Sequence, residues 1–355
     1  REDSLSPESF RRAVMESWAV PTSEQSSRTN ETGLSCRFMQ PFIALTDKAW
    51  FDFLASRSRN GVVDEVNFWS PRSVRPMKHL EPGELVFFRL KRQYQAIAGY
   101  GFFASFQVLD LDTSWELFGW KNGDPDKLRF LQRIGGYRGV DLLDPSAPRA
   151  PIGCHLLRNA VFWEEHRWLA WGDDKGWAPN IVQGRTETDA VRIDLLLHEV
   201  GADAPQEFEA TSFEIMEADE RRVVEASRIE REGQGVFRAR LLDAYGRRCA
   251  ITGEHTEPVL DAAHIQPYLG PRSNHVQNGL LLTKEFHALF DRGYVTVTPD
   301  YVVRVSERLK AEFRNGRRYY PYDGQRLEQI PDDPRLRPSP AALEWHERHV
   351  FRKVA

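Results

Sequence analysis

The chain has 355 residues, of which 41% are hydrophobic and 28% charged, and this composition excludes wholesale disorder. At roughly 100–200 residues per domain, the length predicts two or three domains. No apolar run approaches the ~18–20 residues that a membrane-spanning helix needs, so we expect no membrane association. The net charge of −4 does not by itself mark a nucleic-acid-binding protein, but the charge is unevenly spread along the chain.

The three cysteines, Cys36, Cys154 and Cys249, are widely spaced. They form no CxxC pair, no zinc-ligand pattern and no disulfide framework, so we expect a cytoplasmic protein without a structural zinc ion.

The first 200 residues divide into a short opening and a β-rich domain. Residues 1–37 predict a capped helix followed by a polar linker. Residues 38–201 alternate short apolar runs with turn residues and carry eight of the ten tryptophans, which predicts a β-rich domain. Its expected strands are Phe42–Leu45, Leu85–Leu90, Ala96–Ala98 and Phe102–Val108, and its expected helices lie near 47–56, 112–119 and 125–135.

The remaining residues differ in charge. Residues 202–235 carry ten acids and four arginines, and the spacing of their apolar residues predicts a charged helical connector. Residues 236–355 carry 19 basic and 15 acidic side chains, a net of +4. In this last domain we expect helices at 236–245, 283–290 and 339–352 and a strand pair around 294–305.

One stretch of the last domain carries residues suited to catalysis. His264 ends an apolar strand, an Asn-Gly turn at Asn278 follows fourteen residues later, and His287 lies on a helix nine residues after that. This order suits phosphodiester hydrolysis at a ββα-metal site. A neutral imidazole activates water, an amide orients that imidazole through its ring or the nearby backbone, and a metal held by His and Asp neutralises the phosphate.

The segments Cys249–Gly253, Ala262–Ile265, Asn278–Leu282 and His287–Asp291 resemble the HNH endonucleases, specifically their McrA-like branch. The resemblance covers about residues 236–345. It implies that His264 is the general base, Asn278 the orienting asparagine and His287 a metal ligand.

One position departs from the family pattern. Many HNH enzymes have Asp or His immediately before the base, where this chain has Ala263. Asp261 lies on the same face of the strand and is the expected substitute ligand, with Asp291 as the alternative carboxylate. One imidazole, one carboxylate and phosphate oxygens suit Mg²⁺ or Mn²⁺.

The front domain has a second, looser resemblance. Its segments Asp64–Pro71, Leu80–Leu90 and Ile97–Phe103 resemble the EVE domains of the PUA superfamily. EVE domains and the related SRA and YTH folds hold a modified base in an aromatic pocket, where flat side chains stack on the base and amides read its edge. The residues that this resemblance places in such a pocket are Asn67, Trp69, Ser70, Trp177 and Gln183.

Together these features predict an α+β protein with an N-terminal PUA/EVE-like β-barrel flanked by helices and a C-terminal ββα-metal HNH nuclease domain. The expected activity is restriction of double-stranded DNA that carries a modified cytosine, 5-methyl or 5-hydroxymethyl first. One HNH site nicks one strand, so a double-strand break favours a homodimer. A conventional sequence-reading restriction enzyme and a non-catalytic nucleic-acid-binding module are the alternatives.

Overall fold

The computed structural model describes residues 40–73, 77, 80–91, 93–144, 147, 150–178, 181, 183–201, 212–217, 219, 223–224, 228–229 and 233–353. The helix and linker predicted for residues 1–37 lie outside these ranges. The chain divides into two compact units, Arg1–Pro41 with Thr186–Gln206 and Phe42–Arg185 with Glu207–Ala355. In the first unit, helix α5 (Ala190–Gly201) buries Leu196 and Val200. None of the described helices is long and apolar enough to cross a membrane.

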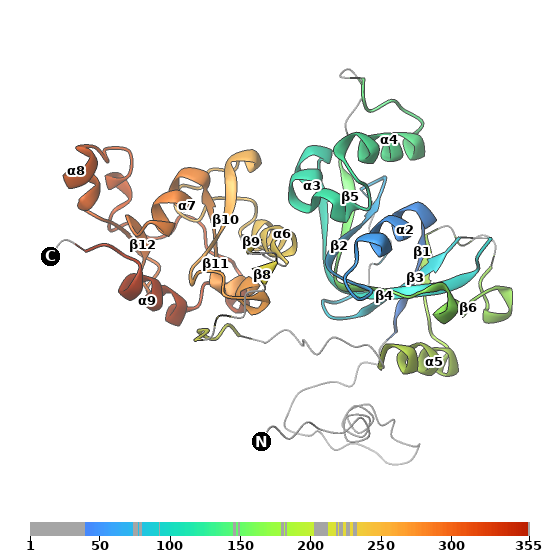
Figure 1. Cartoon of the computed structure of the whole chain (residues 1–355). Helices are drawn as coiled ribbons and strands as arrows, with labels where there is room; N and C mark the ends of the chain where they lie inside the picture. Colours follow the sequence, from blue (N-terminus) through green and yellow to red (C-terminus); the bar gives the residue numbers. More distant parts are fainter. Residues whose placement is uncertain are drawn as a thin grey trace, which may run out of the picture. The chain divides into compact units, whose positions relative to one another are not determined.

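The second unit begins with a mixed sheet whose order is β2-β5-β4-β3-β1-β7, with β6 paired to β4 (Figure 1). Strands β1 and β3 pair in parallel, and β2, β4 and β5 pair antiparallel to their neighbours. The strands are β1 (Phe42–Thr46), β2 (Val62–Ser70), β3 (Leu85–Leu90), β4 (Ala96–Leu109), β5 (Ile152–Phe162), β6 (Leu169–Ala170) and β7 (Gly184–Thr186).

Three helices flank this sheet: α2 (Lys48–Arg57), α3 (Leu111–Phe118) and α4 (Lys127–Arg138). Each begins at an aspartate whose carboxylate accepts backbone N–H groups of the first turn, and these N-caps are Asp47, Asp110 and Asp126. The predicted helices near 47–56, 112–119 and 125–135 are therefore confirmed. The two strands predicted at 96–98 and 102–108 are one long strand, β4, which β-bulges bend without ending it.

From residue 233 onward, this unit contains two short antiparallel sheets, each with a helix beside it. The strands are β10 (Leu260–His264), β11 (Gly279–Thr283), β12 (Val295–Val297) and β13 (Val303–Val305). The helices are α6 (Gln234–Ala244), α7 (Lys284–Asp291), α8 (Arg308–Phe313) and α9 (Pro340–His349). The hairpin of β10 and β11 followed by α7 is the predicted ββα arrangement, and the α+β fold class is confirmed.

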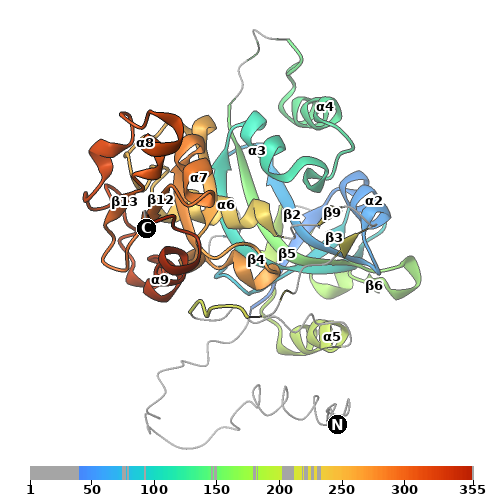
Figure 2. The same ribbon diagram turned by 60° about the vertical axis from the view of Figure 1, so that its left-hand side comes forward.

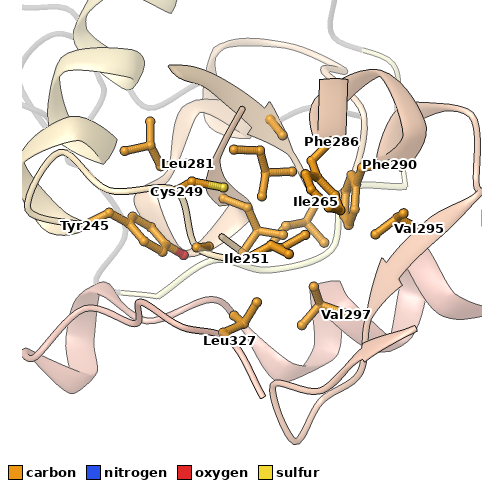
Figure 3. Packing of buried hydrophobic residues seen from close by; sticks show 14 of the residues in the cluster. Tyr245, Cys249, Ile251, Ile265, Leu281, Phe286, Phe290, Val295, Val297 and Leu327 are labelled. Atoms are coloured by element: carbon orange, nitrogen blue, oxygen red, sulfur yellow. The ribbon is translucent and has the colours of Figure 1, made fainter. Parts of the chain in front are cut away.

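One hydrophobic cluster holds these elements together (Figure 3). Phe286 and Phe290 come from α7 and lie beside Ile265, which follows β10. Val295 and Val297 of β12 enter the same cluster, so the hairpin, the helix and the second sheet share one core.

The helix predicted in the connector 202–235 is wrong for the described residues. Residues 213–217 are neither helix nor strand, and β8 (Val223–Val224) pairs with β9 (Arg228–Ile229). The backbone N–H groups of Phe213 and Met216 donate to the side chains of Gln277 and Gln266. The apolar residues of this stretch therefore dock against the hairpin loop, and this tertiary contact overrides their helical spacing.

Candidate functional site

His264 is the last residue of β10, where it pairs with Gly279 of β11. Its imidazole is buried, with 9% exposure, and its Nε2 lies 3.0 Å from Oδ1 of Asn274. With the amide oxygen of Asn274 as acceptor, Nε2 carries the proton and the lone pair of the neutral ring is on Nδ1. The hydrogen bond to Asn274 therefore favours the tautomer of His264 that has its proton on Nε2.

Two aromatic rings fix the plane of this imidazole. The ring of Phe237, on α6, stacks on His264 with centroids 4.2 Å apart and an interplanar angle of 14°. Tyr268 meets the same imidazole edge-on at 5.8 Å. Sequence reasoning missed Phe237, Tyr268 and Asn274. A polar residue four positions before Asn278 in the hairpin loop was the available signal for Asn274, whereas nothing local marked Phe237.

Asn278 is fully buried and contacts the backbone of the hairpin loop. Its Oδ1 accepts the N–H of Gln266 at 2.8 Å, and its Nδ2 donates to the carbonyls of Gln266 and Ser273, each at 3.0 Å. Of the two possibilities left open by the sequence, ring or nearby backbone, the backbone contact is the one observed. Asn278 thereby ties Gln266, the second residue after His264, to Ser273 in the same loop.

The glycine after Asn278 serves close packing. Gly279 has φ −134°, an extended conformation open to any residue, so it is not a turn glycine. A Cβ at this position would lie 2.6 Å from Leu241 and 2.8 Å from Phe237, both on α6. The glycine lets α6 approach the strand that pairs with His264.

Asp261, His287 and Asp291 form a second group, where α7 packs on β10. Nδ1 of His287 lies 2.8 Å from Oδ2 of Asp261, and its Nε2 lies 3.4 Å from Oδ2 of Asp291. Burial lowers the pKa of His287, but the hydrogen bonds to the two carboxylates outweigh it and raise the pKa from 6.5 to about 9. Burial raises the pKa of Asp261, and the hydrogen bond and positive charge of His287 overcome this, so the net shift is downward.

Within the described residues, no group of three His, Cys, Asp or Glu side chains is arranged to hold a metal ion. The pair of Asp261 and His287 nevertheless offers one carboxylate and one imidazole side by side, and their side chains are 38% and 21% exposed. Two protein ligands of this kind fit a hard divalent cation that takes its other ligands from phosphate and water. Asp291, 58% exposed, adjoins the far side of the imidazole.

The residues predicted for a base pocket are spread over the front sheet. Asn67 is fully buried, and its Nδ2 donates to Ser114, Asn122 and Cys154. Trp69 is half-buried and donates its indole N–H to the carbonyl of Asn122 at 2.9 Å. Asn67 and Trp69 therefore lie together and share one partner.

The other three predicted residues do not join that pair. The ring of Trp177 lies 4.2 Å from the guanidinium of Arg89 on β3, and two strands separate β3 from β2. At about 4.8 Å per strand, β2 and β3 are about 14 Å apart, too far for Trp69 and Trp177 to enclose one base. Gln183 is exposed and bonds Leu45 through its backbone carbonyl, and Ser70 donates to the carbonyl of Arg72.

Trp69 instead belongs to a group that we call the α4 cluster, which consists of Asp47, Trp69, Asp124, Arg133 and Tyr137. Tyr137 meets the Trp69 ring edge-on with centroids 6.0 Å apart and donates its hydroxyl to Asp47 at 2.6 Å. Arg133, one helical turn earlier, pairs with Asp124 at 2.7 Å and lies 3.9 Å from Asp47. Sequence reasoning missed all members except Trp69.

Two polar atoms of the α4 cluster are buried without a hydrogen-bond partner among the described residues. They are Oδ2 of Asp124 and Nη1 of Arg133. Oδ1 of Asn67, close to Trp69, is also buried without a hydrogen-bond partner among the described residues. Burial raises the pKa of Asp124 from 3.8 to about 6, although Arg133 opposes the shift. Unsatisfied buried polar atoms are rare in folded proteins, so these atoms require an explanation. The α4 cluster has one hydrogen-bond donor and one acceptor that are not used, together with the aromatic rings of Trp69 and Tyr137.

Residues 249–298 match the family model described as HNH endonuclease. This segment contains His264, Asn278, His287 and Asp261, so the second half of the chain carries an HNH endonuclease domain and the predicted enzyme class is confirmed. HNH endonucleases act on DNA and generally use a divalent metal ion. None of the curated proteins compared with this chain matches it.

Solved structures provide two further similarities. The crystal structure of ASCH from Zymomonas mobilis, a PUA-like protein, is 12% identical with a TM-score of 0.30, and the alignment covers 45% of this chain and 95% of that one. A structure described as the modification-dependent TagI restriction endonuclease is 13% identical with a TM-score of 0.25, covering 81% of this chain and 76% of that one.

Proposed function

We propose that this protein is a modification-dependent endonuclease that cleaves double-stranded DNA containing a modified cytosine, with 5-methylcytosine and 5-hydroxymethylcytosine as the first substrates to test. The HNH endonuclease domain supplies the hydrolysis. The observation that carries the proposed choice of cytosine is the α4 cluster. In it the ion pair of Asp124 and Arg133 keeps one buried oxygen and one buried nitrogen without a hydrogen bond among the described residues, and two aromatic rings lie in the same cluster.

His264 is the general base of the proposed reaction. Its Nδ1 takes the proton of the attacking water, while Nε2 keeps its proton through the hydrogen bond to Asn274. Phe237 and the loop clamped by Asn278 hold the ring in place, so the base needs no reorientation during reaction. Asp261 and His287 would hold Mg²⁺ or Mn²⁺, and the bound ion would neutralise charge on the phosphate and the leaving oxygen.

The α4 cluster complements the Watson–Crick edge of cytosine. That edge presents an amino donor at N4 and acceptors at N3 and O2. The carboxylate of Asp124 accepts from N4, and Nη1 of Arg133 donates to the ring acceptors. Thymine presents an oxygen at the first of these positions, and a carboxylate facing that oxygen is repulsive. The rings of Trp69 and Tyr137 supply a stacking surface for a base that has left the duplex.

A substituent on C5 lies on the opposite side of the base from O2 and forms no hydrogen bond with the edge-reading pair. Discrimination of the modified base therefore rests on apolar contact and on the ease of unstacking, each worth a few kcal/mol or less. We also propose a homodimer, because one HNH site cuts one strand and a double-strand break needs two.

The test is digestion of three matched duplexes, with unmodified, 5-methyl and 5-hydroxymethyl cytosine, by the full chain with Mg²⁺ or Mn²⁺ and by its His264→Ala variant. We expect the wild type to cut the modified duplexes preferentially and the variant to cut none. Equal cutting of all three would favour the sequence-reading enzyme. Binding without cutting by the wild type would favour the non-catalytic module.

A further inference from the structure

Helix α6 begins against a buried carboxylate of the front sheet. Glu65, on β2 and 2% exposed, accepts the N–H of Gly235 at 3.1 Å and that of Val236 at 2.8 Å. The adjacent Asp64 accepts the N–H of Gly233 at 2.8 Å. Lys121 bridges both carboxylates, at 2.8 Å from Asp64 and 3.1 Å from Glu65. The N-terminus of α6 is thus fixed by charge-assisted hydrogen bonds.

The same helix enters two hydrophobic cores. Val236 and Ala239 pack in the cluster of the front domain with Phe118 of α3 and Leu156 of β5. Phe237, one residue after Val236, belongs instead to the core of the nuclease domain. Figures 1 and 2 both show α6 next to α3, in agreement with the contacts of α6 with α3 and β4.

The first turn of α6 also touches the proposed base. The Phe237 ring lies nearly parallel to the His264 imidazole, 4.2 Å away, and its Cα is one residue from the N–H group that Glu65 accepts. The first turn is rigid, because successive helical residues advance only 1.5 Å along the axis and their side-chain directions are fixed. A displacement of the helix start therefore moves the ring that sets the plane of the base.

We infer that Glu65 is a positioning residue for His264 and acts across the domain boundary through α6 and Phe237. The front domain is then part of the machinery that aligns the general base, in addition to any role in DNA recognition. This inference rests on the proposed role of His264. It assigns to Glu65 an effect on the rate of cleavage and not on the affinity for DNA.

Glu65→Gln in the full chain tests the inference. The glutamine keeps the side-chain size but offers one oxygen where the carboxylate offers two, so an N–H donor faces an NH₂ group. We expect kcat on modified duplex to fall about 10- to 100-fold, because a shift of ~1 Å at a catalytic group has an effect of this size. The Kd for DNA, measured with Ca²⁺ in place of the activating metal, should stay within about 2-fold.

Asp126→Asn is the matched control, since Asp126 is a carboxylate cap of another helix of the front domain. We expect at most a small decrease in melting temperature, because asparagine caps a helix about as well as aspartate, and an unchanged kcat at saturating DNA. A wild-type kcat for folded Glu65→Gln would overturn the inference.

A double-mutant cycle separates positioning from simple destabilisation. Phe237→Leu keeps an apolar side chain but removes the ring from the imidazole, and we expect the same loss of kcat. If Glu65 acts through Phe237, the double variant should be no slower than the slower single variant. Multiplied losses would overturn the inference, and Phe237→Leu with wild-type kcat would do so even if Glu65→Gln fails to fold.

The general-base role of His264 and the positioning role of Glu65 can be contradicted by different results. If His264→Ala cleaves normally, the proposed function is wrong, whatever Glu65→Gln does. If His264→Ala is inactive while Glu65→Gln and Phe237→Leu are both normal, only the positioning role is excluded.

Discussion

The carboxylate of Asp261 is hydrogen-bonded to the imidazole of His287 at 2.8 Å, which links the start of β10 to α7. The two residues are separated by 26 positions in the chain and meet because the hairpin of β10 and β11 feeds directly into the helix. Ala263, where related enzymes have a ligand, is instead fully buried in the hydrophobic core. The strand therefore presents its carboxylate two residues earlier than the family pattern.

Our first prediction concerns these ligands. Asp261→Ala and His287→Ala should each raise the Mn²⁺ or Mg²⁺ concentration needed for half-maximal cleavage by about 10-fold or more. Mutation of a residue that only hydrogen-bonds to a metal ligand already lowers metal affinity about 10- to 100-fold. Asp291→Ala should change it less, because Asp291 is the most exposed of the three and its contact with His287 is longer, at 3.4 Å. Metal titration of cleavage on one duplex measures all three variants. An inactive Asp291→Ala beside a normal Asp261→Ala would show that Asp291 is the ligand.

The second prediction concerns the base and its partner. His264→Ala should lower the cleavage rate about 10²- to 10⁴-fold with DNA binding retained, the usual effect of losing a general base. Asn274→Ala should produce a smaller loss and change the pH dependence of kcat, because Nε2 then loses the acceptor that favours its protonation. Single-turnover rates across pH 5.5 to 8.5 make this measurement. An unchanged profile for Asn274→Ala would contradict the tautomer assignment.

The third prediction separates Asn278 from Asn274. Asn278→Ala leaves the buried N–H of Gln266 and two carbonyls without their partner, at a cost of roughly 1–3 kcal/mol for each unpaired group. We expect a clear loss in the free energy of unfolding of the nuclease domain, measured by denaturant titration, together with low activity. Asn274→Ala should lose less stability, because its side chain is not the partner of the backbone groups of Gln266 and Ser273 that Asn278 holds. Equal stability of the two variants would mean that Asn278 does not brace the loop.

The fourth prediction tests the α4 cluster. Asp124→Asn should weaken binding of duplex with modified cytosine by about 1–3 kcal/mol, the usual worth of one base-reading contact, because an amide NH₂ can then face the N4 amino group. Tyr137→Ala removes an exposed stacking ring and should lose a similar amount. Affinities are measured on the His264→Ala background. Tyr94→Ala, another partly exposed tyrosine of this domain, is the control and should bind as before. Wild-type affinity of both variants for the modified duplex would place base reading elsewhere.

The fifth prediction concerns His346, which is 2% exposed and lies between Thr296 and the carbonyl of Phe290. Burial lowers its pKa from 6.5 to about 4, so the unfolded chain takes up a proton at higher pH than the folded one. Stability is then complete above pH 6.5 and falls by roughly 3 kcal/mol as the pH approaches 4. His346→Gln should lack this part of the acid sensitivity, whereas His349→Gln, an exposed position on the same helix, should retain it. Unfolding curves at pH 4 and pH 7 test the difference.

Much of the fold follows from local sequence signals. Leu85–Leu90 is a strand as predicted, because a run that is apolar except for Arg89 and lies between turn residues is suited to the centre of a sheet. The helix caps Asp47, Asp110 and Asp126 mark three helix starts that the sequence placed within a few residues. Strand β5 was missed, although it pairs with both β2 and β4, because its mixture of Cys, His, Arg and Asn gives no alternation.

The sequence predicts only those site residues that stand at regular spacings within the hairpin and the helix that follows it. His264, Asn278 and His287 were found because hairpin and helix place them at fixed intervals. Phe237 could not be found this way, since it contacts His264 from a helix that also packs on another domain. Asp124 and Arg133 stand out because each has a buried atom without a hydrogen bond among the described residues. Burial and hydrogen bonding depend on the tertiary structure, so the residues next to them in the sequence do not reveal either property.

Helix α6 has a consequence for anyone who would recombine this protein with others. A chimera joined just before Gly233 would take Val236 and Ala239 away from the apolar residues of the front domain and leave Glu65 and Lys121 facing a foreign surface. Grafting the nuclease onto another recognition domain therefore requires either carrying the residues that contact α6 or redesigning its first two turns. The unit that can be exchanged as a whole is the pair of domains, and new base preferences are best sought by changing the α4 cluster in place.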